Sequence, residues 1–206
     1  MSKNLTYTLL GEGFAEYAFL KIYLERIVTE KNPNIQVFSS KLMKPSGGKS
    51  SDSKVLANVK NLCVKSFVSR NDIQLFIAGI DLDDTDFEDD LPKHKARIKE
   101  MTDKLGKLHS HFQDKIILFV PIQAVDCWIL YQSYRLKNNT KPANNSLESV
   151  SINDTKKKLY GTNINQTKIE GIAKEVAEKA DFEELAKQSK SFKLFHEQLK
   201  QFIEKY

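Results

Sequence analysis

The chain has 206 residues, of which 40% are hydrophobic, with a formal net charge of +5 and a pI of about 9.0. This length fits one domain with a small helical addition, and the hydrophobic share is enough for a sizeable core. No apolar run approaches the roughly 20 residues of a membrane span, and the N-terminus lacks the plan of a signal peptide, so we expect a cytoplasmic protein that makes no membrane contact. Cys63 and Cys127 are far apart and fit no metal spacing, which favours buried, reduced thiols.

Hydrophobic patterning predicts alternating strands and helices over the first 136 residues. Strands are expected at residues 4–10, 35–39, 73–80 and 115–120. Helices are expected at residues 14–30, 55–68, 93–112 and 124–136. This alternation predicts an α/β domain over residues 1–136, with a parallel four-stranded sheet flanked by helices and right-handed crossovers.

The last third of the chain has a different pattern. Residues 137–150 are polar and rich in turn-forming residues, which predicts a mobile loop or linker. Helical periodicity follows at residues 167–180 and 182–206. We therefore expect residues 151–206 to form a helical C-terminal extension that packs on the domain.

Two short acidic clusters follow two of the predicted strands. The first contains Glu12 and Glu16, and the second contains Asp81 and Asp83. Ligands of open α/β sheets bind at the carboxyl ends of the strands, and carboxylates are suitable ligands for Mg²⁺ or Mn²⁺. Glu12 could instead cap the following helix, because the helix dipole favours an anion there. The later acids, from Asp86 to Asp90, are expected to lie in a solvated loop.

Charge is unevenly distributed along the chain. Residues 41–70 carry seven basic residues and one acid, whereas residues 81–90 carry seven acids and no base. A basic segment beside an acidic pocket suits a polyanion whose backbone must approach metal ions, although a solvated basic loop is the simpler alternative. The candidates for contacting a nucleic-acid backbone are Lys41, Lys44, Lys49 and Lys54.

These motifs resemble the TOPRIM domain of topoisomerases, primases and OLD-type nucleases. Residues 11–16 read Gly-Glu-Gly-x-x-Glu after the first strand, and residues 81–83 read Asp-x-Asp after a later one. Small stand-alone bacterial TOPRIM proteins of the RloB kind are a closer likeness. They also carry Pro-x-x-x-x-Glu-x-Trp, which residues 121–128 match except for Asp126, and a Ser-x-Phe-like segment that is similar to residues 189–192. The resemblance covers roughly residues 5–136 and implies a TOPRIM-like Rossmannoid fold.

The resemblance implies a role for each matching acid. Glu12, Asp81 and Asp83 would bind one or two Mg²⁺ or Mn²⁺ ions, and Glu12, Glu16 and Asp126 would take part in catalysis. So many carboxylates in one place raise each other's pKa unless a cation neutralises them. Bound metal would polarise a scissile phosphate, activate water and stabilise the leaving oxygen. Asp126 is one methylene shorter than the usual glutamate, so it could instead orient a neighbouring group.

The favoured function is a metal-dependent nuclease that cleaves phosphodiester bonds in DNA or RNA. The relatives imply bacterial or phage defence with a separate ATPase partner, since this chain has no ATPase motif, and they leave room for a homo-oligomer. One alternative is a module of the same fold that binds nucleic acid or a protein partner without catalysis. Another is a phosphatase-like enzyme for a small phosphate ester, which would need a closed pocket rather than an open groove beside residues 41–70.

Overall fold

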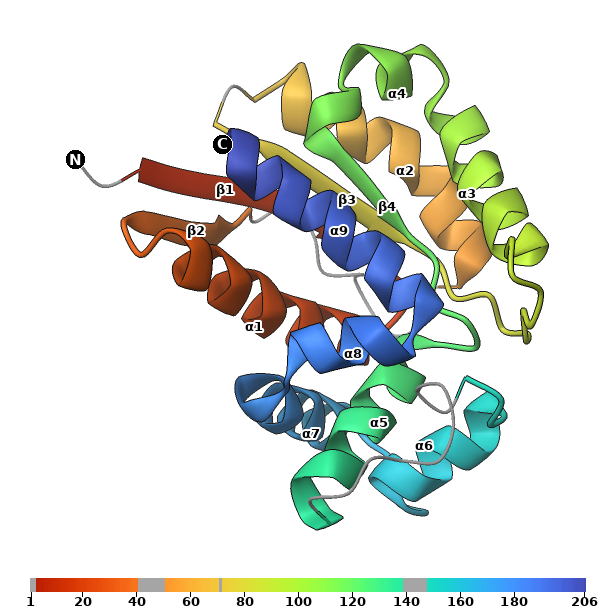
Figure 1. Cartoon of the computed structure of the whole chain (residues 1–206). Helices are drawn as coiled ribbons and strands as arrows, with labels where there is room; N and C mark the ends of the chain where they lie inside the picture. Colours follow the sequence, from red (N-terminus) through yellow and green to blue (C-terminus); the bar gives the residue numbers. More distant parts are fainter. Residues whose placement is uncertain (1–2, 41–50, 71, 139–147) are drawn as a thin grey trace.

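A four-stranded, all-parallel β-sheet forms the centre of the protein (Figure 1). The computed structural model describes residues 3–40, 51–70, 72–138 and 148–206. The strands, in the spatial order β2-β1-β3-β4, are β1 (Lys3–Leu10), β2 (Ile35–Ser39), β3 (Leu75–Gly79) and β4 (Ile116–Phe119). All three neighbouring pairs are parallel. The prediction of an α/β fold with a parallel four-stranded sheet flanked by helices is confirmed.

The strand order reverses between β1 and β3. The chain leaves β1 through α1 (Phe14–Lys31) to reach β2 on one side, and then crosses to β3 on the other side of β1. Leu10 is paired in register with Ala78, so the two strands end close to the same level. Their following loops diverge at the carboxyl edge, which is where open α/β sheets form a ligand-binding crevice.

Helices cover both faces of the sheet. One face is covered by α1, α5 (Val125–Asn138) and α9 (Lys190–Lys205), and the other by α2 (Asp52–Phe67) and α3 (Pro92–Leu105) (Figure 1). Strand side chains alternate between the two faces, as the pleat requires. The first core receives Leu5, Tyr7, Leu9, Leu75, Ile77, Ile117 and Phe119, and the second receives Leu10, Phe76, Ala78, Ile116 and Leu118.

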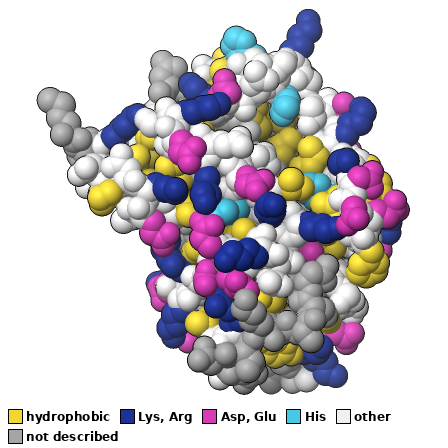
Figure 2. All heavy atoms as spheres, viewed as in Figure 1, with side chains coloured by type: hydrophobic (Ala, Val, Ile, Leu, Met, Phe, Trp, Pro, Cys, Tyr) yellow, Lys and Arg dark blue, Asp and Glu magenta, His cyan; other side chains and the backbone are white. Residues whose placement is uncertain are grey.

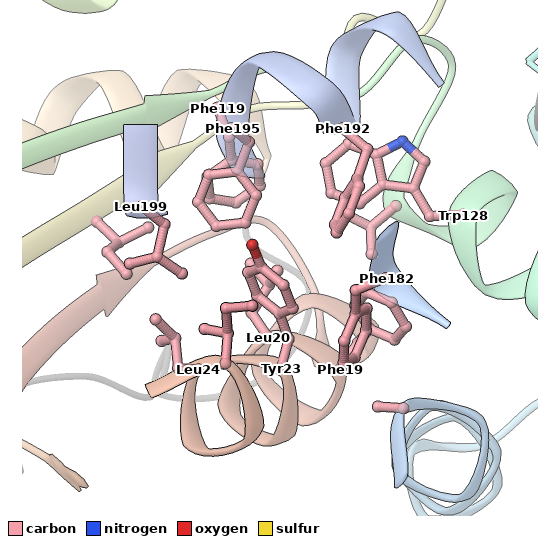
Figure 3. Close-up of a cluster of buried hydrophobic side chains, with 14 of the residues drawn as sticks. Phe19, Leu20, Tyr23, Leu24, Phe119, Trp128, Phe182, Phe192, Phe195 and Leu199 are labelled. Carbon is pink, nitrogen blue, oxygen red and sulfur yellow. The ribbon is translucent and has the colours of Figure 1, made fainter. Parts of the chain in front are cut away.

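Aromatic side chains join the C-terminal helices to the sheet (Figure 3). Tyr23 of α1 contacts Phe182 of α8 (Phe182–Gln188) with ring centroids 4.7 Å apart. Trp128 of α5 contacts Phe192 of α9 at 5.0 Å. Such pairs stabilise by roughly 0.5–1.5 kcal/mol each beyond the burial of their area. The C-terminal helices and the sheet therefore share one hydrophobic core.

Two further helices lie in this part of the chain, α6 (Ile152–Tyr160) and α7 (Gln166–Lys179). Patterning predicted α7 but not α6. The expected loop or linker at residues 137–150 falls largely outside the described residues, which resume at Glu148. Within the described ranges, no helix is long and apolar enough to cross a membrane.

The two long predicted helices are each interrupted. The helix expected at 93–112 ends at Gly106, whose φ of 58° breaks it into α3 and the short α4 (Lys107–His111), which a 3₁₀ turn, η1 (Gln113–Lys115), follows. The helix expected at 182–206 is broken at Ser189, which has an extended backbone and caps α9 by accepting a hydrogen bond from the Phe192 N–H at 2.9 Å. A residue that caps a new helix satisfies its free N–H groups and so fixes where the helix begins.

Candidate active site

All five candidate carboxylates line one pocket at the carboxyl edge of the sheet. The pocket has a volume of about 340 Å³ and contains Glu12, Glu16, Asp81, Asp83 and Asp126. They come from the loop after β1, the first turn of α1, the loop after β3 and the first turn of α5. Parallel strand topology brings these distant positions together. We call this space the acidic pocket.

Glu12 connects the loops that follow β1 and β3. Its Oε1 accepts a hydrogen bond from the backbone N–H of Asp81 at 2.8 Å. The N-cap of α1 is Gly13, which makes no side-chain capping bond. Within the described residues Glu12 thus makes no capping hydrogen bond to α1, and one of its oxygens is engaged between the two loops instead.

The two glycines of the first motif make room for Glu16. A Cβ at Gly13 would lie 2.9 Å from a carboxylate oxygen of Glu16, and one at Gly11 would lie 3.3 Å from its Cβ. The Gly-x-Gly pattern thus lets the buried Glu16 side chain approach the loop backbone. Spacing alone predicted a shared face for Glu12 and Glu16, and close packing explains the glycines.

Burial makes three of these carboxyl groups unusually weak acids. Glu16 and Asp81 are only 4% and 7% exposed. Burial, opposed by the hydrogen bond from Asp81, raises the pKa of Glu12 to about 7. Burial and the nearby Asp126 carboxylate raise the pKa of Glu16 to about 7, and burial raises the pKa of Asp81 well above its usual range. The folded protein consequently favours a proton or a cation in the acidic pocket at neutral pH.

One carboxylate oxygen of Asp81 lacks a hydrogen-bond partner among the described residues. This oxygen, Oδ1, is buried. A buried, unpaired carboxylate oxygen is costly, and such groups usually coordinate metals or pair with a cation. This oxygen is therefore a place in the acidic pocket where a proton or a cation would supply the missing partner.

The loop that carries Asp83 is held by the loop that follows β4. The Asp83 N–H donates to the carbonyl of Gln123 at 3.0 Å, and the Gln123 N–H donates to the carbonyl of Asp84 at 3.0 Å. Asp83 and Gln123 both have positive φ, of 55° and 61°. Asp tolerates this region better than most residues, whereas it is uncommon for Gln. The two loops together place Asp83 at the exposed rim of the pocket.

Asp126 is engaged by α6. The hydroxyl of Tyr160 donates to its Oδ1 at 2.5 Å, and the Lys156 Nζ lies 3.6 Å from its Oδ2. Both oxygens of Asp126 thus have a partner, and its role in catalysis or in orienting a neighbour stays a prediction. Tyr160 and Lys156 also line the acidic pocket. Sequence reasoning missed both because it missed α6, although Ser151, which accepts from the Asp154 N–H at 3.3 Å, is a recognisable cap.

Whether the acidic pocket suits a metal ion depends on how many protein side chains that ion needs as ligands. In the described part of the chain, no three His, Cys, Asp or Glu side chains are arranged closely enough to form a complete metal cluster. Mg²⁺ usually keeps several waters and is held by one or two carboxylates plus substrate phosphates. The free Asp81 oxygen and the weak acidity around it fit such an ion. Asp81, with at most one of the other two predicted ligands, Glu12 or Asp83, would hold it together with water or a substrate phosphate.

The basic residues predicted to bind nucleic acid are mostly outside the described residues. Lys41, Lys44 and Lys49 fall in the range 41–50, and Lys54 is exposed on α2. Figure 2 shows basic and acidic side chains interspersed on the face it presents. The role of these lysines stays a prediction.

The prediction that the acids from Asp86 to Asp90 lie in a solvated loop is wrong for Asp86. Asp86 is buried, and its Oδ2 accepts a hydrogen bond from the His94 N–H at 2.9 Å. His94 lies in the first turn of α3, so Asp86 satisfies a free N–H of that helix. Asp84 and Asp89 are exposed and pair with Lys93 and Lys190.

The fold and this pocket define an α/β protein with carboxylates gathered at the edge of a parallel sheet. Comparison with family models, curated proteins and solved structures gives no match. The interpretation of the pocket therefore rests on its own geometry and on the sequence motifs.

Proposed function

We propose that the protein is a TOPRIM-like, Mg²⁺- or Mn²⁺-dependent nuclease that hydrolyses phosphodiester bonds. The observation that carries the proposal is the buried Oδ1 of Asp81, which has no hydrogen-bond partner among the described residues and lies in a pocket lined by four other carboxylates. Bound metal would supply Lewis-acid activation of the phosphate and of a water.

The chain's own residues have suitable chemistry for the remaining tasks. Burial raises the pKa of Glu12 to about 7 in the metal-free protein, so a metal that Glu12 helps to hold would displace a proton from it near neutral pH. Lys156 offers a positive charge at the pocket wall, where a phosphate oxygen would lie. Ser51 lines the pocket at the N-cap of α2, and a helix N-terminus favours anions.

Cleavage assays with paired variants test this proposal. Single- and double-stranded DNA and RNA would be incubated with the wild type and with Asp81→Asn and Asp83→Asn, in Mg²⁺, Mn²⁺ or EDTA. We expect metal-dependent cleavage that falls by about 100-fold or more in both variants, since they weaken metal binding. Asp84→Asn is the matched control, because Asp84 is exposed, pairs with Lys93 and does not line the pocket. Equal cleavage by all three variants would refute the site.

The second candidate is a non-catalytic module that binds nucleic acid or a protein partner. It is favoured by the absence of a complete metal cluster in the described residues and by the engagement of Asp126 with α6. Wild-type protein that binds nucleic acid but does not cleave it in either metal would select this candidate. A separate ATPase partner and a role in defence belong to the proposal only through the resemblance to TOPRIM proteins.

A further inference from the structure

A second and larger cavity lies beside the acidic pocket, between α1, α7 and the ends of β1 and β2. Its volume is about 720 Å³, within the roughly 300–1,000 Å³ of ligand sites. The two spaces share no lining residue among those described, yet they are adjacent. Consecutive residues line the two spaces: Glu16 and Ile169 line the acidic pocket, whereas their neighbours Tyr17 and Glu170 line the second cavity. We call the larger space the tyrosine cavity; the helices α1 and α7 that border it contact one another (Figure 1).

The tyrosine cavity has a mixed lining, in which aromatic and branched side chains from β1 and α1 stand beside polar and charged ones. Tyr7 and Leu9 contribute from β1, and Tyr17 and Ile22 from α1. The hydroxyl of Tyr17 accepts a hydrogen bond from the Gly11 N–H at 3.1 Å, which helps to fix the orientation of its ring. Aromatic and branched side chains at fixed positions suit a planar ligand ring, which can stack or pack edge to face against them.

Tyr7 supplies an unused polar group to this lining. The residue is only 2% exposed, and within the described residues its hydroxyl makes no hydrogen bond, although this oxygen is not fully enclosed by protein atoms. A tyrosine hydroxyl at the wall of a cavity can bond to water or to a polar group of a ligand. Burial, together with the Glu25 carboxylate, raises the pKa of Tyr7, so the hydroxyl keeps its proton and can donate. The tyrosine cavity therefore offers a directed hydrogen bond next to an apolar surface.

The charges around the cavity disfavour an anionic ligand. Lys21 lies 3.9 Å from Glu25, and Lys174 lies 3.8 Å from Glu178, so each lysine is matched by a carboxylate of its own helix. Glu170 adds a further acid to the lining. Two lysines against three glutamates would repel a phosphate and admit a neutral or weakly basic ring.

We propose that the tyrosine cavity binds a nucleobase, as a neutral heteroaromatic ring with a hydrogen-bonding edge. The ring lies against the apolar part of the lining, and its edge bonds to the hydroxyl of Tyr7. The base belongs either to a free nucleoside or to a single strand whose backbone passes the adjacent acidic pocket. This inference goes beyond the proposed function, because binding here requires neither metal nor cleavage.

Gly171 provides a way to fill the cavity without disturbing its walls. It lies on α7 and lines the cavity, and a Cβ added there would meet no atom within 4 Å. Gly171→Phe places a ring in the space that the nucleobase would occupy. Gly171→Ala is the matched control, because it adds only the Cβ and favours the helix.

The test measures binding of adenosine, guanosine, cytidine and uridine to the full chain in EDTA, by saturation-transfer NMR and calorimetry. We expect at least one nucleoside to bind the wild type and Gly171→Ala equally, and Gly171→Phe at least about tenfold more weakly. Tyr7→Phe should weaken binding by about fivefold to tenfold, as expected for one lost hydrogen bond, without changing the unfolding midpoint. Failure of all four nucleosides to bind the wild type, or equal binding by Gly171→Phe, would overturn the proposal. A loss of stability in Gly171→Phe alone would do so too, because it would mean that the cavity is already filled.

A second arm identifies the source of the base. A labelled single-stranded pentanucleotide is titrated into the same variants in EDTA. Weaker binding of the strand by Gly171→Phe assigns the cavity to a base within a strand, whereas an unchanged strand affinity with impaired nucleoside binding assigns it to a free nucleoside. Because neither arm uses cleavage, its result is independent of whether the nuclease proposal holds.

Discussion

Removing the buried charge of Glu16 should make the metal-free protein more stable at alkaline pH. The pKa of Glu16 is raised from 4.5 to about 7, by burial first and then by Asp126. The folded state therefore holds a proton that the unfolded chain releases, and the stability of the wild type falls as the pH rises from about 4.5 through 7. The full difference between the two pKa values corresponds to about 3 kcal/mol of unfolding free energy. About 2 kcal/mol of this stability is lost between pH 5.5 and pH 8.

Urea unfolding of the wild type and Glu16→Gln in EDTA at several pH values measures this effect. The difference in unfolding free energy between the two proteins is the useful quantity, because the contributions of the histidines to stability are the same in both proteins and cancel. Burial lowers the pKa of His94 and of His196, which makes their contribution to stability rise with pH, opposite to that of Glu16. We expect the advantage of Glu16→Gln to grow by about 2 kcal/mol from pH 5.5 to pH 8.

A control variant and a metal titration test whether the effect comes from the buried charge of Glu16. Glu175→Gln on α7, at an exposed position paired with Lys179, should show a difference that stays flat with pH. Mn²⁺ should stabilise the wild type more at pH 8 than at pH 5.5, since protons compete with a metal for the same carboxylates. A difference between wild type and Glu16→Gln that is constant within about 0.5 kcal/mol over this range would refute the electrostatic reasoning.

Three other variants test how the site and its supports are held. Tyr160→Phe should lower the unfolding free energy by about 2 kcal/mol in urea titrations at pH 8, because Asp126 loses a buried donor; a change near zero would contradict that contact. Gly79→Ala should cost about 2–3 kcal/mol or prevent folding, measured by the thermal midpoint, because its Cβ would overlap the buried ring of Phe119. Gly106→Ala should cost about 1–3 kcal/mol in the same assay through its backbone conformation, φ 58° and ψ −133°, since its Cβ would meet only one atom, at 3.9 Å; a neutral result would contradict this account of the break between α3 and α4.

The sheet and the meeting of the acids could be predicted because both follow from local pattern plus one topological rule. The continuous apolar run before Asp81 identifies a central strand, and parallel strands necessarily end at a common edge. The two strands therefore predict Glu12 and Asp81 at the same edge, and the pairing of β1 with β3 in the structure makes them neighbours. The glycines beside Glu12 support the same conclusion, since they permit the approach of Glu16.

The contribution of α6 could not be predicted in the same way. Lys156 and Tyr160 reach the pocket through the packing of α5 on α6, which no local pattern encodes. The burial of Asp86 likewise depends on where α3 begins, because its carboxylate caps that helix rather than facing water. Sequence spacing identifies which acids can meet, whereas tertiary packing decides which of them are already engaged.

The aromatic cluster under α8 and α9 has a consequence for folding during synthesis. Every strand of the sheet is made before these helices, so the face that bears Tyr23, Phe119 and Trp128 emerges from the ribosome with no cover. Until α9 docks, this surface is an exposed apolar patch of the kind that promotes aggregation or recruits chaperones. A nascent chain interrupted before Ser189 would carry all five acids of the pocket yet lack α9, which covers this apolar face.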